Sequence, residues 1–213
     1  MAAHLAPSAP LVAETGGLNA MVVDATALPE QAVRDIVMSA FRSAGQRCSA
    51  LRMLYVQQEI ADRLLPMLEG AMDCLALGDP WQAETDIGPV IDGPARAAIL
   101  EHVEAARREG RVLKEAKVPA EGHFVAPTLL RLPGIEALER EVFGPVLHVA
   151  TYPAGGLDAV IAAVNAKGYG LTFGLHSRID ARADRVAGQV RAGNVYVNRN
   201  QIGAVPGVQP FGG

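Results

Sequence analysis

The sequence has few cysteines, few aromatic residues and no long apolar run, and these shortages exclude several classes of protein. Its two cysteines are too few for a disulfide framework and lack the paired spacing of a zinc site. No segment approaches the roughly 20 apolar residues of a membrane-spanning helix. The start of the chain lacks the basic and apolar regions of a secretory signal. We therefore expect a protein with no membrane span and no metal site. We also expect its setting to be the reducing cytoplasm, which suits a free thiol.

The sequence also lacks an excess of positive charge and lacks the common phosphate-binding motifs. With 19 Lys and Arg against 23 Asp and Glu, the formal net charge is −4. Electrostatics therefore gives no reason to expect nucleic acid or an anionic membrane as a partner. Neither a Gly-x-Gly-x-x-Gly turn nor a P-loop occurs. Five histidines match no ligand or triad spacing, which indicates structural or surface roles for His4, His102, His123, His148 and His176.

Short apolar runs alternate with amphipathic segments along the chain, and half of the residues are hydrophobic. The pattern predicts strands over 18–24, 53–56, 171–176 and 194–198, and extended segments near 123–130 and 145–152. It predicts helices from 29 toward 45 and over 60–75, 95–109, 157–167 and 181–192. This alternation predicts βαβ units, and hence an α/β fold with an open, largely parallel sheet flanked by helices.

Two short motifs supply a carboxylate and a thiol, namely Glu14-Thr15-Gly16-Gly17 and Gly45-Gln46-Arg47-Cys48. An ionised thiol is a nucleophile and a carboxylate can take a proton from water, so the pair permits covalent catalysis through a thioester. Cys48 is expected in a loop after a helix, where the charge of Arg47 favours its thiolate. Cys74 falls within the apolar periodicity of the helix over 60–75, so we expect it in the core. Taken alone, these motifs also describe an ordinary turn and a small buried residue.

The spacing and order of the motifs resemble the aldehyde dehydrogenase superfamily. Glu14 and Cys48 lie 34 positions apart, and a third motif follows in the order of the family, Glu141-Val142-Phe143-Gly144-Pro145-Val146. The resemblance implies that Cys48 is the nucleophile and that Glu14 is the general base, activating the water that hydrolyses a thioester.

The same resemblance implies NAD as the cofactor. Glu141 and Phe143 match the family positions that contact the nicotinamide ribose and ring. Gly16 and Gly17, which carry no Cβ, would let the backbone approach the cofactor closely. Without this match, Glu141 is one more charge in an acidic run.

Three segments resemble more narrowly the glutamate γ-semialdehyde (1-pyrroline-5-carboxylate) dehydrogenases and the C-terminal half of bifunctional bacterial proline utilisation proteins. They are residues 13–17, 43–52 and 198–213. The resemblance implies a small aldehyde with an amino-acid head, held by Arg47, Ser49, Gly203, Ala204 and Phe211. A hydroxyl and exposed backbone amides suit a small carboxylate. The alternative for the last segment is a glycine-rich surface loop.

The resemblance covers nearly all of this chain but only part of a family subunit. Residues 1–10 are expected to be a disordered or non-native start. Residues 11–213 are expected to form the catalytic domain, without the N-terminal dinucleotide-binding domain and truncated at both ends. The resemblance leaves open a homo-oligomeric parent protein.

The implied reaction is NAD-dependent oxidation of L-glutamate γ-semialdehyde to L-glutamate through a thiohemiacetal and a thioester on Cys48. We expect the isolated chain to be inactive or weakly active. Two alternatives stay open. One is a cofactor-independent thiol hydrolase or acyl transferase that uses Cys48 and Glu14, and the other is an inactive fragment that acts in binding or assembly.

Overall fold

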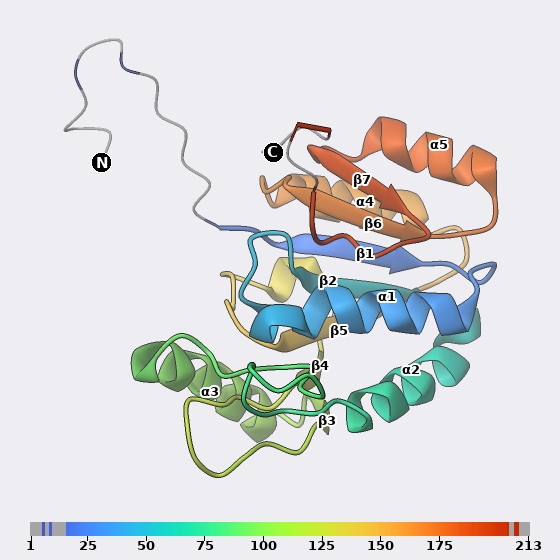
Figure 1. The fold of residues 1–213 in the computed structure, drawn as a ribbon. Helices are drawn as coiled ribbons and strands as arrows, with labels where there is room; N and C mark the ends of the chain where they lie inside the picture. The colour runs from blue at the N-terminus through green and yellow to red at the C-terminus, as the bar shows by residue number, and fades with distance from the viewer. Residues whose placement is uncertain (1–5, 7–8, 10–15, 205–206, 209–213) are drawn as a thin grey trace.

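The structure is a computed structural model that describes residues 6, 9, 16–204 and 207–208. Within them, one seven-stranded sheet lies between two layers of helices (Figure 1). The strand order is β3-β4-β5-β2-β1-β6-β7, and every neighbouring pair is parallel except β3 and β4. The strands are β1 (Asn19–Val23), β2 (Leu51–Gln57), β3 (Val112–Glu115), β4 (Thr128–Arg131), β5 (Val146–Tyr152), β6 (Thr172–His176) and β7 (Asn194–Val197).

Two of the helices begin at a clear start signal in the sequence. Pro29 occupies the first turn of α1, where its missing N–H is not needed. The Asp92 side chain caps α3 by accepting a hydrogen bond from Ala95 N at 2.8 Å. The helices are α1 (Pro29–Phe41), α2 (Gln58–Asp73), α3 (Gly93–Arg108), α4 (Leu157–Ala166) and α5 (Asp180–Gln189), with short 3₁₀ helices η2 (Arg42–Gly45) and η3 (Ile135–Ala137).

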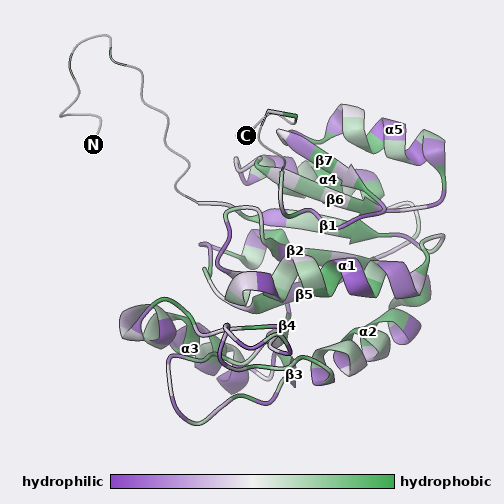
Figure 2. Ribbon diagram, viewed as in Figure 1, coloured by the Kyte–Doolittle hydropathy of each residue, from purple (hydrophilic) through white to green (hydrophobic). Residues whose placement is uncertain are grey.

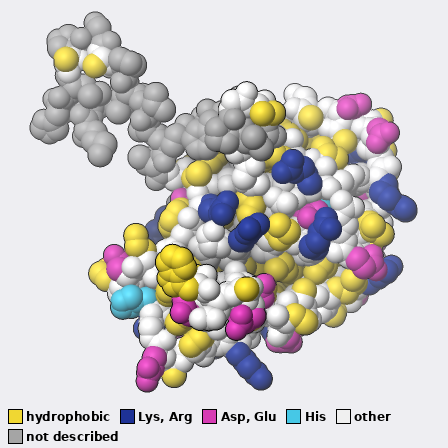
Figure 3. All heavy atoms as spheres, viewed as in Figure 1, with side chains coloured by type: hydrophobic (Ala, Val, Ile, Leu, Met, Phe, Trp, Pro, Cys, Tyr) yellow, Lys and Arg dark blue, Asp and Glu magenta, His cyan; other side chains and the backbone are white. Residues whose placement is uncertain are grey.

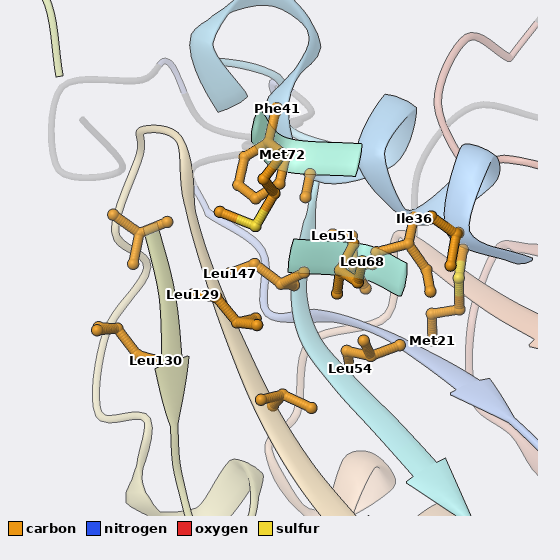
Figure 4. Packing of buried hydrophobic residues seen from close by; sticks show 14 of the residues in the cluster. Met21, Ile36, Phe41, Leu51, Leu54, Leu68, Met72, Leu129, Leu130 and Leu147 are labelled. Carbon is orange, nitrogen blue, oxygen red and sulfur yellow. The ribbon is translucent and has the colours of Figure 1, made fainter. Parts of the chain in front are cut away.

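The sheet is apolar on both faces. Met21 and Val23 of β1 belong to a core cluster with residues of α1, α2 and α3, whereas Ala20 and Val22 belong to a second cluster with residues of α4 and α5. Successive strand residues point to opposite faces, so a strand covered by helices on both sides must be apolar throughout. Figure 4 shows the first cluster, in which Phe41 and Met72 meet beside the sheet.

The outer surface is mixed in character. Figure 2 shows apolar residues along the strands and purple, hydrophilic residues on the outward sides of the helices. Figure 3 shows basic and acidic side chains together on the face in view, with apolar atoms between them. Among the described residues, no helix combines the length and the apolarity needed to cross a membrane.

The predicted α/β class and largely parallel sheet are confirmed, and most predicted elements lie within a few residues of their expected bounds. Only the end of the predicted extended segment 123–130 forms a strand, β4. The antiparallel β3 is not predicted, because a four-residue, half-buried edge strand gives little periodicity. The assignment of residues 11–213 to one catalytic domain stays a prediction.

The prediction that Cys74 belongs to the core is wrong. Cys74 caps the C-terminal end of α2, and its side chain is exposed. The backbone of Cys74 is still helical, but its position lies off the buried stripe of α2, which consists of Ala61, Leu64, Leu68 and Met72.

Candidate active site

The sequence motifs come together at one end of the sheet, where its parallel strands begin. Gly17, Cys48 and Glu141 lie just before β1, β2 and β5, and these three strands are parallel neighbours. The amino-terminal ends of parallel strands lie at the same end of the sheet, which is on the left in Figure 1. Ligands of open α/β sheets usually bind at the opposite, carboxyl edge. The candidate site of this chain therefore lies at the amino-terminal ends of the strands, which is the less usual place for a ligand.

A left-handed turn leads from α1 to Cys48. Ser43, Ala44 and Gly45 have φ values of 56°, 53° and 66°. A Cβ atom on Gly45 would overlap with the carbonyl group of Gly144. The motif that contains Cys48 therefore packs directly against the motif that contains Glu141, and only glycine allows this approach.

Arg52 connects the motifs from inside the protein. Its side chain is fully buried, and Nε and Nη2 donate to Glu141 Oε1 at 3.1 and 2.9 Å. Nη1 donates to Gly144 O at 3.1 Å and Nη2 to Arg47 O at 3.3 Å. Burial lowers the pKa of Arg52, and the neighbouring Glu141 carboxylate opposes this shift. A buried cation needs such a partner, so the two residues form one unit.

The predicted cofactor residues are grouped around this unit. Gly17 N donates to Glu141 Oε2 at 3.0 Å, and Gly16 lies beside the same carboxylate oxygen. The Arg52 guanidinium lies 5.4 Å from the ring centroid of Phe143, whose side chain is 46% exposed. The Glu141 side chain is 13% exposed, so its carboxylate is both anchored and accessible.

Most of the predicted substrate residues line a cavity of about 360 Å³. They are Arg47, Ser49, Gly203 and Ala204, and they are joined by the predicted nucleophile Cys48 and by Gln46, Leu171, Thr172 and Asn194. Cys48 is half-buried and has a free thiol. Arg47 Nε donates to Ser43 Oγ at 3.0 Å, so this side chain is partly engaged along its own loop. Glu14 and Phe211 lie outside the described residues.

Sequence reasoning missed two buried polar residues. Asn19 donates through Nδ2 to Cys48 O at 2.7 Å and to Ala50 O at 2.9 Å, and Arg52 makes the contacts given above. The available signal was a polar residue in each of two otherwise apolar strands, residues 18–23 and 51–56. A buried polar side chain needs partners, and both residues find at least one of them in the backbone of the Cys48 loop.

His148 contacts the backbone of Arg52 in the interior of the protein. It is fully buried, and its Nδ1 lies 3.0 Å from Arg52 O. Since a carbonyl oxygen only accepts, Nδ1 is the donor, and the neutral ring accepts at Nε2 from His102 Nε2 at 2.9 Å. In the described part of the chain, no group of three His, Cys, Asp or Glu side chains is arranged to hold a metal ion.

Comparison with known proteins gives consistent results. The family model described as "Aldehyde dehydrogenase family" matches residues 1–213. The chain is 52% identical over 212 residues to the bifunctional protein PutA of Klebsiella aerogenes, which covers 96% of this chain and 16% of that protein. It is 37% identical over 206 residues to the 1-pyrroline-5-carboxylate dehydrogenase of Geobacillus kaustophilus, covering 95% of this chain and 40% of that protein.

A solved structure of similar fold is the 1-pyrroline-5-carboxylate dehydrogenase from Thermus with bound NAD. The TM-score is 0.85 at 33% identity, over 93% of this chain and 39% of that chain. The chain thus spans well under half the length of these relatives. Since the family model matches every residue, the chain belongs to the aldehyde dehydrogenase family.

Proposed function

We propose that this chain is the part of an L-glutamate γ-semialdehyde dehydrogenase that contains the nucleophile, Cys48. The observation that supports this most directly is that Cys48 lines the cavity of about 360 Å³. Its loop is joined through Arg52 to the anchored carboxylate of Glu141. The similarity to proteins named PutA and 1-pyrroline-5-carboxylate dehydrogenase supports the same substrate. The cytoplasmic setting stays a prediction.

Cys48 would begin the reaction by adding its thiolate to the aldehyde carbon, which places negative charge on the aldehyde oxygen. The backbone N–H of Cys48 is available to stabilise this oxyanion, because no described residue accepts from it. Loss of hydride from this adduct to the nicotinamide cofactor, which would supply the acceptor when bound, would leave a thioester on Cys48. Water activated by a base, for which we propose Glu14, then releases the acid.

The residues around Glu141 fit a nicotinamide cofactor. Glu141 Oε2 receives one N–H from Gly17 and keeps acceptor capacity for ribose hydroxyls. The exposed ring of Phe143 offers a face for stacking. When bound, NAD would supply the hydride acceptor. A similar protein, the enzyme from Thermus, has a structure with bound NAD.

The substrate head would be held by residues that line the same cavity as Cys48. Ser49 supplies a hydroxyl, and the backbone amides of Gly203, with φ of 79°, and Ala204 belong to a non-regular segment that lines the same cavity. Such groups bind a small carboxylate without a dedicated cation. The volume of about 360 Å³ suits a small amino-acid aldehyde.

The test is NADH formation from glutamate γ-semialdehyde, measured for the chain alone and for the chain joined to the dinucleotide-binding segment that precedes it in aldehyde dehydrogenases. We expect activity in the joined protein, and we expect Cys48→Ala to abolish it. Cys74→Ala is the matched control, since Cys74 is exposed and is not among the residues that line the cavity, and it should leave the activity unchanged. Activity that survives Cys48→Ala would contradict the proposal. Ester turnover by Cys48 without any aldehyde oxidation would favour the thiol hydrolase instead.

A further inference from the structure

We propose that Asn19 is a positioning residue for the chemistry of Cys48, because its side-chain amide holds the carbonyl group of the nucleophile itself. The proposal rests on the proposed role of Cys48 as a nucleophile that attacks carbonyl carbon. Asn19 touches neither substrate nor cofactor in this arrangement. It acts through the backbone of the Cys48 loop.

The Asn19 side chain is 3% exposed, and both its N–H donors and its oxygen are hydrogen-bonded. Nδ2 donates to Cys48 O at 2.7 Å and to Ala50 O at 2.9 Å, and Oδ1 accepts from Thr172 N at 3.1 Å. The two carbonyl groups only accept and the amide N–H only donates. The orientation of the Asn19 amide is therefore fixed by its partners.

The contact between Asn19 and Cys48 O also determines the direction of the Ser49 N–H group. In a trans peptide the C=O and the following N–H point in opposite directions, and the described chain has no cis peptide bond. Because Cys48 O points at the buried Asn19, the N–H of Ser49 points away from it. In the same way, the contact of Arg47 O with Arg52 Nη2 directs the N–H of Cys48 away from the interior.

The turn over residues 47–50 presents these two N–H groups to the cavity. Ala50 N donates to Arg47 O at 3.0 Å, which closes the turn, whereas no described residue accepts from Cys48 N or Ser49 N. Both residues line the cavity of about 360 Å³. Successive free N–H groups in a turn form a concave site for an anion. We therefore infer that Ser49 N–H is a second donor to the oxyanion, held in place by Asn19.

Asn19→Asp is the sharpest variant, since it keeps the shape and the acceptor for Thr172 N but removes both donors to the Cys48 loop. Without these donors, the peptide between Cys48 and Ser49 is free to rotate, and Ser49 N–H loses its direction. The matched control is Asn198→Asp. Asn198 also donates to a backbone carbonyl, Ser177 O at 2.8 Å, but it lies at the opposite, carboxyl edge of the sheet.

The experiment compares two reactions of Cys48 in the full chain with Cys74→Ser as background. p-Nitrophenyl acetate acylates the thiolate: the S–C bond forms, the carbonyl electron pair moves to oxygen, and collapse of this oxyanion expels p-nitrophenolate. Iodoacetamide alkylates the same thiolate by displacing iodide at a saturated carbon, with no oxyanion. Since neither reaction needs NAD, the result is independent of whether the chain oxidises an aldehyde.

We expect Asn19→Asp to slow acylation by about 10- to 100-fold. This is less than the roughly 100- to 1000-fold loss for removing an oxyanion donor, because the variant misdirects the Ser49 N–H and does not remove it. Alkylation should change less than about threefold, and Asn198→Asp should change neither rate. Asn19→Ser, which keeps one short donor, is measured beside it and should give an intermediate loss if Asn19→Asp does not fold. Equal changes in both reactions, unchanged acylation, or no acylation of Cys48 in the unmodified protein would each overturn the proposal.

Discussion

At the scale of single residues, Arg52 makes the best-defined buried contacts. It supplies one charge to a pair with Glu141 and also donates to the carbonyl groups of Arg47 and Gly144. These partners belong to two different motifs. A fork of N–H groups on a planar guanidinium can hold them together, and a single ammonium cannot.

Replacing Arg52 should therefore be costly. Arg52→Met leaves Glu141 with Gly17 N–H as its one remaining described partner, and we expect a loss of about 3–5 kcal/mol in the free energy of unfolding. Arg52→Lys keeps the charge but loses the fork, so its loss should be smaller. Urea unfolding followed by circular dichroism measures both. A loss below about 1 kcal/mol for Arg52→Met would show that the pair is dispensable.

At the scale of elements, the turn that follows α1 determines where Cys48 lies. Three consecutive left-handed residues, of which Ser43 and Ala44 are not glycine, are unfavourable on their own and need support from their surroundings. The support comes from the adjacent motif, because Gly45 lies against Gly144. Strained backbone of this kind is concentrated at functional sites.

This arrangement predicts opposite effects for two glycine substitutions. Gly45→Ala forces a Cβ into the carbonyl group of Gly144 at positive φ, and it should cost more than about 2 kcal/mol and slow the acylation of Cys48. Gly70→Ala is the matched control. Gly70 lies in α2 with open space around its Cβ position, so the change should stabilise by about 0.5–1 kcal/mol. Thermal unfolding of both variants gives the comparison, and a tolerated Gly45→Ala would refute the packing argument.

At the scale of the whole molecule, three histidines lie in surroundings that disfavour their charged form. Burial lowers the pKa of His148 to about 3 from an ordinary value of 6.5. Burial also lowers the pKa of His102, with help from Arg111 and Arg140. The pKa of His176 is lowered by burial as well, against the attraction of Asp35 at 3.7 Å.

The consequence is a molecule that loses stability in acid. Between pH 6.5 and about 3 the unfolded chain binds a proton at position 148 that the folded chain does not. The free energy of unfolding should therefore fall by about 1.4 kcal/mol per pH unit from His148 alone, and this contribution is complete above pH 6.5. Urea midpoints from pH 7 to 5 test the slope. It should flatten in His148→Asn and persist in His123→Gln, which changes an exposed side chain; an unchanged slope in His148→Asn would contradict the assignment.

How far the sequence predicts this protein differs between elements and contacts. The helix over 157–167 and the strand over 171–176 occur as α4 and β6, because their apolar periodicity is strong and turns separate them. The exposed Cys74 and the missed β3 lie at an element end and a sheet edge, where periodicity is weakest.

The sequence by itself determined the alternation of strands and helices and the family, and it pointed to the loop for which we propose the nucleophile, because these depend on local periodicity and on short motifs. Only the tertiary structure decided that Gly17, Cys48 and Glu141 meet at the amino edge of the sheet, since that depends on the strand order β5-β2-β1. It also decided that Asn19 and Arg52 hold the loop. Their partners lie up to 153 positions away in the sequence, and no local pattern records such a contact.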